Sequence, residues 1–217
     1  MIITIDGPAG AGKSSAAKLL AQRLGYDFLD TGAMYRAVTL AALRRQLDLH
    51  DQDALAQLLD TLQLELPAGR VLLNNEDITG LIRTPQITAA SAPIASSPVV
   101  RRRLAEWQRR IAQGRNIVCE GRDQGTLVFP QAECKFFLVA EPGERACRRL
   151  RELLARGETT TLEEVLAAQQ ARDARDAARD VTPMVPAADA LVLDSTPATL
   201  AEVVARREHE VRQRQLR

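Results

Sequence analysis

The residues best suited to chemistry form the string Gly7-Pro-Ala-Gly-Ala-Gly12-Lys13-Ser14, which satisfies the G-x-x-x-x-G-K-[ST] pattern. Glycines let such a loop curl so that its N–H groups face phosphate oxygens, and the following helix adds partial positive charge. Lys13 is expected to reach the β- and γ-phosphates, and Ser14 to ligate Mg²⁺. The residues expected to bind ATP here are Gly7, Pro8, Ala9, Gly10, Ala11, Gly12, Lys13, Ser14 and Ser15.

Two further strings could bind a second, anionic substrate. Asp30-Thr-Gly-Ala-Met-Tyr35-Arg36 follows one expected strand, and Glu120-Gly-Arg122-Asp123 follows another. Phosphoryl transfer works by positioning and by neutralising charge on the moving group, which favours several arginines near a phosphate loop. Glu120 could assist Mg²⁺ hydration or contact the acceptor, and the sequence leaves both roles open.

Arginines also recur at helical spacing later in the chain. Arg172, Arg175 and Arg179 lie on one expected helical face, which is either part of a phosphate site or a solvated, salt-bridged surface. A second basic cluster lies on the expected helix Glu144–Arg156 and includes Arg148. That helix is either a lid that closes on ATP or an exposed basic helix.

Three classes of P-loop protein compete for this pattern. A GTPase switch would need the guanine-reading string Asn-Lys-x-Asp, which the sequence lacks, and Asp77-Ile-Thr-Gly80 lies in an expected insertion. A motor or helicase ATPase would usually be larger. A small-molecule kinase fits the length of 217 residues, and a P-loop protein that holds ATP without turnover remains an alternative.

Composition agrees with an ordinary globular enzyme. Hydrophobic residues make up 46% and charged residues 26%, and the net charge of +1 gives no support for bulk nucleic-acid binding. We expect a cytoplasmic protein because no secretory leader or membrane-length apolar run is present and the three cysteines lack metal spacing. We also expect a monomer without a membrane or nucleic-acid partner, since the charged helices leave no large apolar patch.

Strands and helices alternate along most of the chain. Strands are expected at Met1–Asp6, Tyr26–Leu29, Asn116–Cys119, Lys135–Val139 and Ala190–Leu193. Helices are expected at Ser14–Leu24, Ala33–Gln46, from Asp51, at Val100–Ile111, at Glu144–Arg156, at Thr161–Arg179 and from Thr199. This alternation predicts an α/β fold with a parallel sheet, helices on both faces and ligands beyond the carboxyl ends of the strands.

The rhythm is interrupted by Leu62–Pro98, where a period of two residues replaces the helical period. Gln63–Leu66 and Arg70–Asn74 are expected to form a small hairpin. The chain is therefore divided into a core of residues 1–61 and 99–217, with a lid at about 144–165, and an inserted subdomain of residues 62–98.

Taken together and in this order, the motifs resemble the bacterial cytidylate kinases over almost the whole chain. The resemblance rests on the P-loop, Asp30–Arg36, Ile82-Arg-Thr84, Gly121-Arg-Asp-Gln-Gly-Thr126, Arg172-Asp-x-Arg-Asp-x-x-Arg179 and Ala187–Thr196. It implies a P-loop, three-layer α/β/α core with a five-stranded parallel sheet, a helical lid and a monophosphate-binding insertion. It also implies Mg²⁺-dependent transfer of the ATP γ-phosphate to CMP or dCMP.

The resemblance also implies roles for particular residues. The expected catalytic residues are Lys13, Arg122, Arg172 and Arg179, with Arg148 added to those that bind ATP. The expected CMP-binding residues are Thr31, Tyr35, Arg36, Arg101, Arg122, Asp123, Asp176 and Arg179. Asp176 would hold the ribose, while Asp123 and Arg101 would read the cytosine edge. Kinases of UMP or dTMP are the nearest enzymatic alternatives.

The sequence departs from the family pattern in the expected cytosine pocket. A pocket serine of the family aligns with Ala92, and Ser91 and Pro93 flank it. One hydrogen bond to the base, worth about 1 kcal/mol, is therefore either lost or supplied by Ser91.

Overall fold

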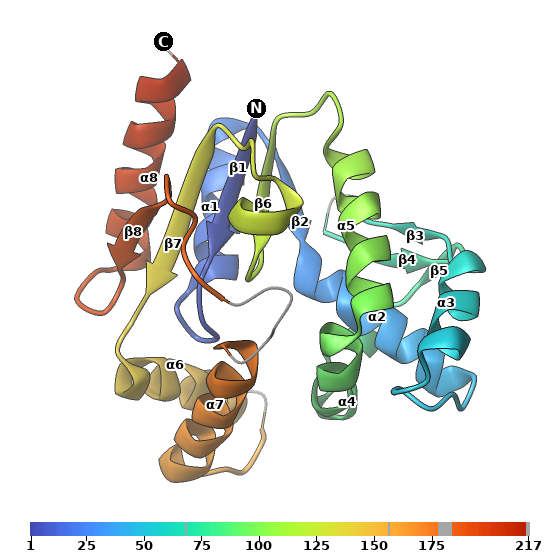
Figure 1. Cartoon of the computed structure of the whole chain (residues 1–217). Helices are drawn as coiled ribbons and strands as arrows, with labels where there is room; N and C mark the ends of the chain where they lie inside the picture. Colours follow the sequence, from blue (N-terminus) through green and yellow to red (C-terminus); the bar gives the residue numbers. More distant parts are fainter. Residues whose placement is uncertain (68, 156, 178–183, 216–217) are drawn as a thin grey trace. The chain divides into compact units, whose positions relative to one another are not determined.

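The computed structural model describes residues 1–67, 69–155, 157–177 and 184–215. These residues belong to two compact units (Figure 1), and each is described by itself. The first unit consists of Met1–Phe28 and Arg115–Arg217, and the second of Leu29–Gly114. The inserted segment expected at 62–98 falls within the second unit, and its role as a separate substrate-binding subdomain stays a prediction.

A five-stranded sheet has the order β2-β6-β1-β7-β8. Its strands are β1 (Ile2–Asp6), β2 (Asp27–Asp30), β6 (Ile117–Glu120), β7 (Cys134–Val139) and β8 (Leu191–Asp194). β1 runs parallel to both β6 and β7, and β7 runs parallel to β8. The expected α/β fold with a five-stranded parallel sheet is confirmed.

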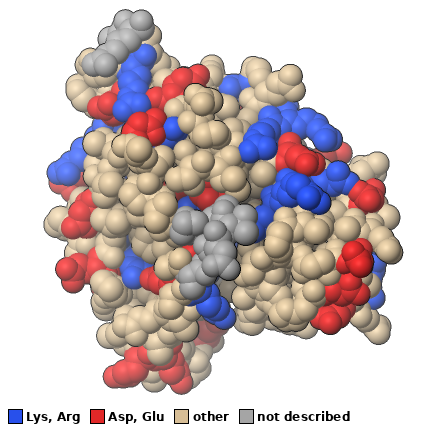
Figure 2. All heavy atoms as spheres, viewed as in Figure 1, with Lys and Arg blue, Asp and Glu red and all other residues tan. Residues whose placement is uncertain are grey.

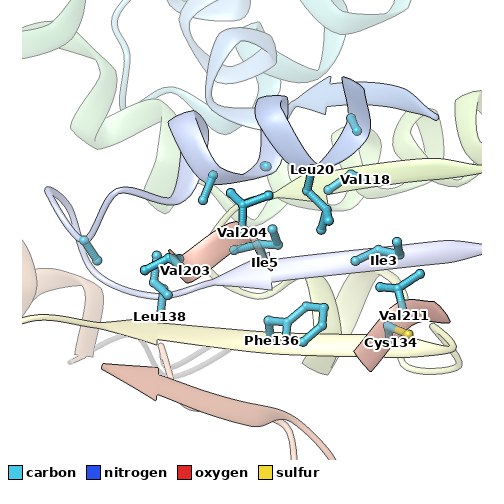
Figure 3. Close-up of a cluster of buried hydrophobic side chains, with 14 residues drawn as sticks. Ile3, Ile5, Leu20, Val118, Cys134, Phe136, Leu138, Val203, Val204 and Val211 are labelled. Atoms are coloured by element: carbon cyan, nitrogen blue, oxygen red, sulfur yellow. The ribbon is translucent and has the colours of Figure 1, made fainter. Parts of the chain in front are cut away.

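The apolar core of the first unit lies on one face of this sheet. Ile3 and Ile5 of β1 are fully buried together with Leu20, Phe136 and Val204 (Figure 3). Leu20 comes from α1 (Lys13–Leu24) and Val204 from α8 (Leu200–Gln215), so these two helices cover that face. Because side chains alternate along a strand, Thr4 and Asp6 of β1 point to the other face.

Three connections that leave the carboxyl ends of the strands lead toward the expected site. β1 leads through the P-loop into α1, and β6 leads into the one-turn π-helix η2 (Gln124–Val128). β7 leads into α6 (Pro142–Ala155), which is followed by α7 (Leu162–Ala177). The expected helix Thr161–Arg179 is thus found over its described part, and its last residues lie outside the described chain.

The second unit contains helices α2 (Thr31–Arg44), α3 (Gln52–Asp60) and α5 (Pro98–Ala112). Asp30 and Asp51 cap α2 and α3, because each carboxylate accepts hydrogen bonds from N–H groups of the first turn. The first of these helices was expected to end at residue 46 and ends at 44, and the third was expected to end at 111 and ends at 112. The second was expected to begin from residue 51 and begins at 52.

The expected hairpin is part of a three-stranded antiparallel sheet, β3 (Leu64–Glu65), β4 (Leu72–Leu73) and β5 (Glu76–Asp77). Asn74 and Asn75 both have positive φ, at 48° and 67°, and make the tight turn between β4 and β5. The sequence analysis expected no strand after Asn74 in this segment and therefore missed the two-residue strand β5.

A second element was also missed. The 3₁₀ turn η1 (Leu81–Arg83) leads into α4 (Pro85–Ser96), which carries Pro93 in its interior. Proline at the first position of a helix is favourable, and the Thr84 side chain caps the N–H of Ile87. The helix was overlooked because its small residues give a weak apolar stripe.

The face shown in Figure 2 carries basic and acidic side chains side by side, as the net charge of +1 suggests. Within the described segments, no helix is both long and apolar enough to cross a bilayer.

Candidate active site

The P-loop is shaped by glycines at positions that other residues could not occupy. Gly7 has φ +135°, and a Cβ there would lie 2.0 Å from the carbonyl oxygen of Leu138 on β7. Gly10 and Gly12 also have positive φ, at 78° and 83°. The loop therefore has the curled backbone that the motif predicts, directly between β1 and α1.

Lys13 is the charged centre of this loop. Its side chain is buried, and Nζ donates a hydrogen bond to the carbonyl oxygen of Pro8 at 2.8 Å. Burial is the main cause that holds the pKa of Lys13 well below its ordinary value; the positive charges of Arg122 and, more weakly, Arg172 add to it, while the carboxylate of Glu120 opposes it. A phosphate bound here would favour the charged form of Lys13.

Ser14 supplies a site suited to Mg²⁺. Its hydroxyl donates to Oε1 of Glu120 at 2.9 Å, where β6 ends. Hydroxyl and carboxylate oxygens are the hard donors that Mg²⁺ prefers, and the ion usually takes few protein ligands beside phosphates and water. This fits the absence, in the part of the chain that the structure describes, of any cluster of three His, Cys, Asp or Glu residues able to hold a metal.

The segment after β6 brings Arg122 to the loop. Arg122 donates from Nη1 to the carbonyl oxygen of Gly7 at 3.0 Å and from Nε to Asp176 on α7 at 3.1 Å. Asp123 is buried beside it, with 5% of its surface exposed. The π-helix that follows orders this segment, because the N–H groups of Val128 and Phe129 donate to carbonyls five residues earlier.

Helix α7 faces the loop with only some of the expected arginines. Arg172 lies near enough to Lys13 to lower its pKa, and Asp176 is buried against Arg122. Arg172 and Arg175 are both exposed. A functional face of Arg172, Arg175 and Arg179 stays a prediction, and Arg179 lies outside the described residues.

Arg148 reaches the P-loop through Ser195. Its Nη2 donates to the backbone oxygen of Ser195 at 2.7 Å and its Nη1 to the hydroxyl at 3.1 Å. The Ser195 hydroxyl lies 3.1 Å from the carbonyl oxygens of Ala11 and Val139 and can donate to either. The structure thus places Arg148 beside the loop, as expected of a residue that binds ATP.

The second unit orders its own candidate group around Asp30. Asp30 caps α2, accepts from Nη2 of Arg36 at 3.3 Å and lies 3.5 Å from Nη2 of Arg83. Thr31 is the first residue of α2 and is buried, and Tyr35 lies one turn later on the same helix. Thr31, Tyr35 and Arg36 are therefore brought together at the start of α2.

Arg101 lies on α5 within the second unit. It is 7% exposed, and Nη1 donates to the carbonyl oxygen of Ala95 at 3.1 Å. On α4, Ser91 donates its hydroxyl proton to the carbonyl oxygen of Thr88 at 2.8 Å. Ser91 can therefore offer a ligand only its acceptor lone pairs while that bond is made.

Three residues that support the P-loop segment escaped the sequence analysis. The buried carboxylate of Asp6 accepts the N–H groups of Gln124 at 2.9 Å and Gly125 at 2.7 Å. Ser195 and Arg145 contact carbonyl oxygens of the loop. The position of Asp6 at the end of a central strand was a usable signal, whereas the other two contacts depend on packing between distant segments.

Comparison with known proteins gives a consistent result. A family model described as cytidylate kinase matches residues 3–213. A curated cytidylate kinase of Rhodopirellula baltica is 50% identical over 203 residues, which cover 94% of this chain and 89% of the relative. Those of Carboxydothermus hydrogenoformans and Ligilactobacillus salivarius are 46% and 48% identical, covering 95% and 93% of this chain and 95% and 92% of the relatives.

A solved structure, that of an uncharacterised protein from Eubacterium ventriosum, aligns with a TM-score of 0.52 at 11% identity, covering 100% of this chain and 99% of that one. This likeness concerns the fold alone. The match of the family model and the relatives at nearly full length agree with the geometry of the P-loop and of the segment after β6. The chain belongs to the cytidylate kinase family.

Proposed function

We propose that the chain transfers the γ-phosphate of ATP to CMP or dCMP, giving ADP and the corresponding diphosphate. The observation that supports this best is the convergence of two cationic side chains on the P-loop: buried Lys13 donates to the carbonyl oxygen of Pro8 at 2.8 Å, and Arg122 donates to that of Gly7 at 3.0 Å. Such crowding of cations is unfavourable without a ligand and favourable around a transferring phosphoryl group.

We assign the donor side to the P-loop. The backbone N–H groups of residues 7–15 other than Pro8 would hold the triphosphate, with Arg148 beside them, and Lys13 would contact the β- and γ-phosphates. Bound Mg²⁺, held by Ser14 with Glu120 behind it, would neutralise charge on the phosphate oxygens. No side chain needs to remove a proton, because the attacking phosphate oxygen of the acceptor is already anionic.

We assign the acceptor side to the residues that the family resemblance singles out. Thr31, Tyr35 and Arg36 at the start of α2 would hold the phosphate of CMP together with Arg122 and Arg179. Asp176 would bind the ribose. The buried carboxylate of Asp123 would accept from the amino group of cytosine, and Arg101 would donate to its ring acceptors. Uracil would set an oxygen against a buried carboxylate and is therefore expected to bind poorly.

The test is an ADP-release assay with ATP, Mg²⁺ and each of CMP, dCMP, UMP, dTMP and AMP. We expect rapid turnover with CMP and dCMP alone. Arg122→Ala should lower kcat by about 100-fold or more, while Arg175→Ala, which alters an exposed arginine of α7, should change it by less than about two-fold. Comparable turnover with UMP would contradict the assigned base specificity, and no turnover with any acceptor would contradict the kinase function.

A further inference from the structure

An ion pair between buried Arg145 and partly buried Asp173 joins the two helices after β7 to the P-loop. Arg145 on α6 is 5% exposed, and its Nη1 lies 2.6 Å from Oδ2 of Asp173 on α7. The same nitrogen donates to the carbonyl oxygen of Ala9 at 3.0 Å, and Nε donates to the carbonyl oxygen of Ala140 at 3.1 Å. One guanidinium thus links α7, the P-loop and the end of β7.

The neighbouring residue of the loop is closely packed against the same helices. A Cβ on Gly10 would lie 2.9 Å from Nε2 of Gln169, and 3.0 and 3.1 Å from Cβ and the carbonyl oxygen of Arg145. Gln169 is itself buried and donates from Nε2 to the carbonyl oxygen of Arg145 at 3.2 Å. Because Gly10 leaves no space there, small movements of α6 or α7 must move the loop backbone.

The other contacts of α7 concern residues to which we have assigned chemistry. Arg172 immediately precedes Asp173 and lowers the pKa of Lys13 by its charge. Asp176, less than one turn later, is held against Arg122 at 3.1 Å. The ion pair therefore holds α7 at Asp173, which lies between Arg172 and Asp176. Because the helix is nearly rigid over this length, fixing Asp173 also fixes the other two residues.

We propose that Arg145 and Asp173 are positioning residues, whose ion pair couples the P-loop backbone at Ala9 to α7 and thereby sets Arg172 and Asp176 in place for phosphoryl transfer. The role of Arg172 in this inference rests on the proposed function. Arg145 and Asp173 act through the loop and through α7, and they touch no reacting atom. Burial of Arg145 makes the pair effective, since loss of Asp173 leaves the guanidinium charge in a poorly solvated place, while Asp173 itself is 21% exposed.

The first experiment compares Asp173→Asn and Arg145→Gln with a matched control. Arg149→Gln breaks an exposed ion pair on the same helix, that between Arg149 and Glu152. At saturating substrates we expect the first two variants to lower kcat about ten-fold or more, and the control to change it by less than about two-fold. Because the two residues share one interaction, the double variant should lose little more than either single variant.

The second experiment separates positioning from general destabilisation. Asp173→Asn is repeated in a background that carries both Arg172→Ala and Asp176→Ala, and thermal unfolding of every variant is followed by circular dichroism. If the ion pair acts by placing Arg172 and Asp176, Asp173→Asn should lower kcat by less than about two-fold in that background. An undiminished ten-fold loss there, or an unchanged kcat in the folded single variants, overturns the proposal.

A third measurement keeps this proposal apart from the proposed function. Affinity for Mg-ATP is measured by calorimetry without any acceptor. Arg145→Gln, which removes the support of the Ala9 carbonyl, should weaken it about ten-fold, and Arg149→Gln should not. If the unaltered protein phosphorylates no monophosphate, the proposed function fails. Even then, weaker binding of Mg-ATP by Arg145→Gln supports the coupling of the ion pair to the P-loop, and unchanged binding contradicts it.

Discussion

The carboxylate of Asp6 fixes the start of η2, because its two oxygens accept the N–H groups of Gln124 and Gly125. Burial is the main cause that raises the pKa of Asp6 from 3.8 to about 6. The folded protein therefore keeps this proton at a pH where the unfolded chain has released it. Asp6 stabilises the fold most below about pH 4, and this contribution is lost as the pH rises through about 6.

Asp6→Asn should remove that pH dependence. The amide presents N–H groups to backbone N–H groups, so we expect a loss of stability of about 1–3 kcal/mol. The free energy of unfolding is measured by urea denaturation at about pH 5 and about pH 8, and the difference between unaltered protein and variant should be larger at the lower value. An equal difference in the free energy of unfolding at the two pH values would contradict the raised pKa of Asp6.

The hydroxyl of Ser14 supports a second prediction at this scale. Ser14→Ala removes the hydroxyl that we assign to Mg²⁺ and leaves Glu120 without that hydrogen bond. The Mg²⁺ concentration for half-maximal turnover should rise about ten-fold, and a chelator should abolish turnover of the unaltered protein. Thr199→Ala, which alters a cap of α8, serves as the control. An unchanged Mg²⁺ titration would contradict the assignment.

Much of the candidate site follows from residue types and spacing, and the rest does not. The P-loop motif identifies Lys13 and Ser14 because its geometry is local and depends on three glycines. Arg145 and Ser195 could not be assigned in this way, since each contacts the loop from a segment more than 130 residues away. Helical spacing also could not decide the role of the face that carries Arg172, because the same spacing fits a phosphate site and a solvated surface equally well.

Helix α8 carries an unusual buried charge. Arg207 is 0% exposed, its guanidinium lies 5.7 Å from the ring centre of Phe136, and its three nitrogens have no hydrogen-bond partner among the described residues. Burial lowers the pKa of Arg207 to about 9. The charge is therefore a cost to folding at neutral pH, which the contact with the aromatic ring offsets only in part.

Arg207→Met should raise the free energy of unfolding by about 1 kcal/mol or more at neutral pH, since methionine fills similar volume without a buried charge. The advantage should shrink as the pH rises above about 9, where the folded arginine loses its proton. Urea denaturation at both conditions measures this. If Arg207→Met is instead less stable than the unaltered protein, the buried guanidinium stabilises the fold and the prediction is wrong.

At the level of elements, the sequence predicts long regular segments and misses short ones. The buried strand β1 and the helices α1, α2 and α3 have clear periodicity and capping residues. Strand β5 has two residues, and α4 contains a proline and mostly small side chains. The π-helix η2 depends on the Asp6 carboxylate, which lies 118 residues before Gln124. Short or tertiary-supported elements leave little local signal.

For the molecule as a whole, the reactivity of the cysteines measures how often the folded first unit opens to solvent. Cys119 and Cys134 are fully buried on β6 and β7. Burial raises the pKa of both thiols, to about 11 for Cys134. Cys147 on α6 is only partly buried. The reactive thiolate form is thus suppressed wherever the sheet is intact.

An aromatic disulfide reagent at about pH 8 should label Cys147 quickly, and should label Cys119 and Cys134 only when the protein opens. Replacing Cys147 by serine should remove the fast phase. Saturating Mg-ATP should slow the remaining two further, because ligand binding stabilises the folded state. Rapid labelling of Cys119 or Cys134 in the folded protein would contradict this account.

The close fit of Gly7 against the carbonyl oxygen of Leu138 has a consequence for how the chain is made. Strand β1 is synthesised more than 100 residues before its partners β6 and β7. At about 5–20 residues per second, the strand waits roughly 7 to 27 s for them. During this time its apolar residues have only α1 to cover them. The segment with the clearest signature for nucleotide binding is therefore synthesised well before β7, and the close contact of Gly7 with Leu138 can form only once β7 is made.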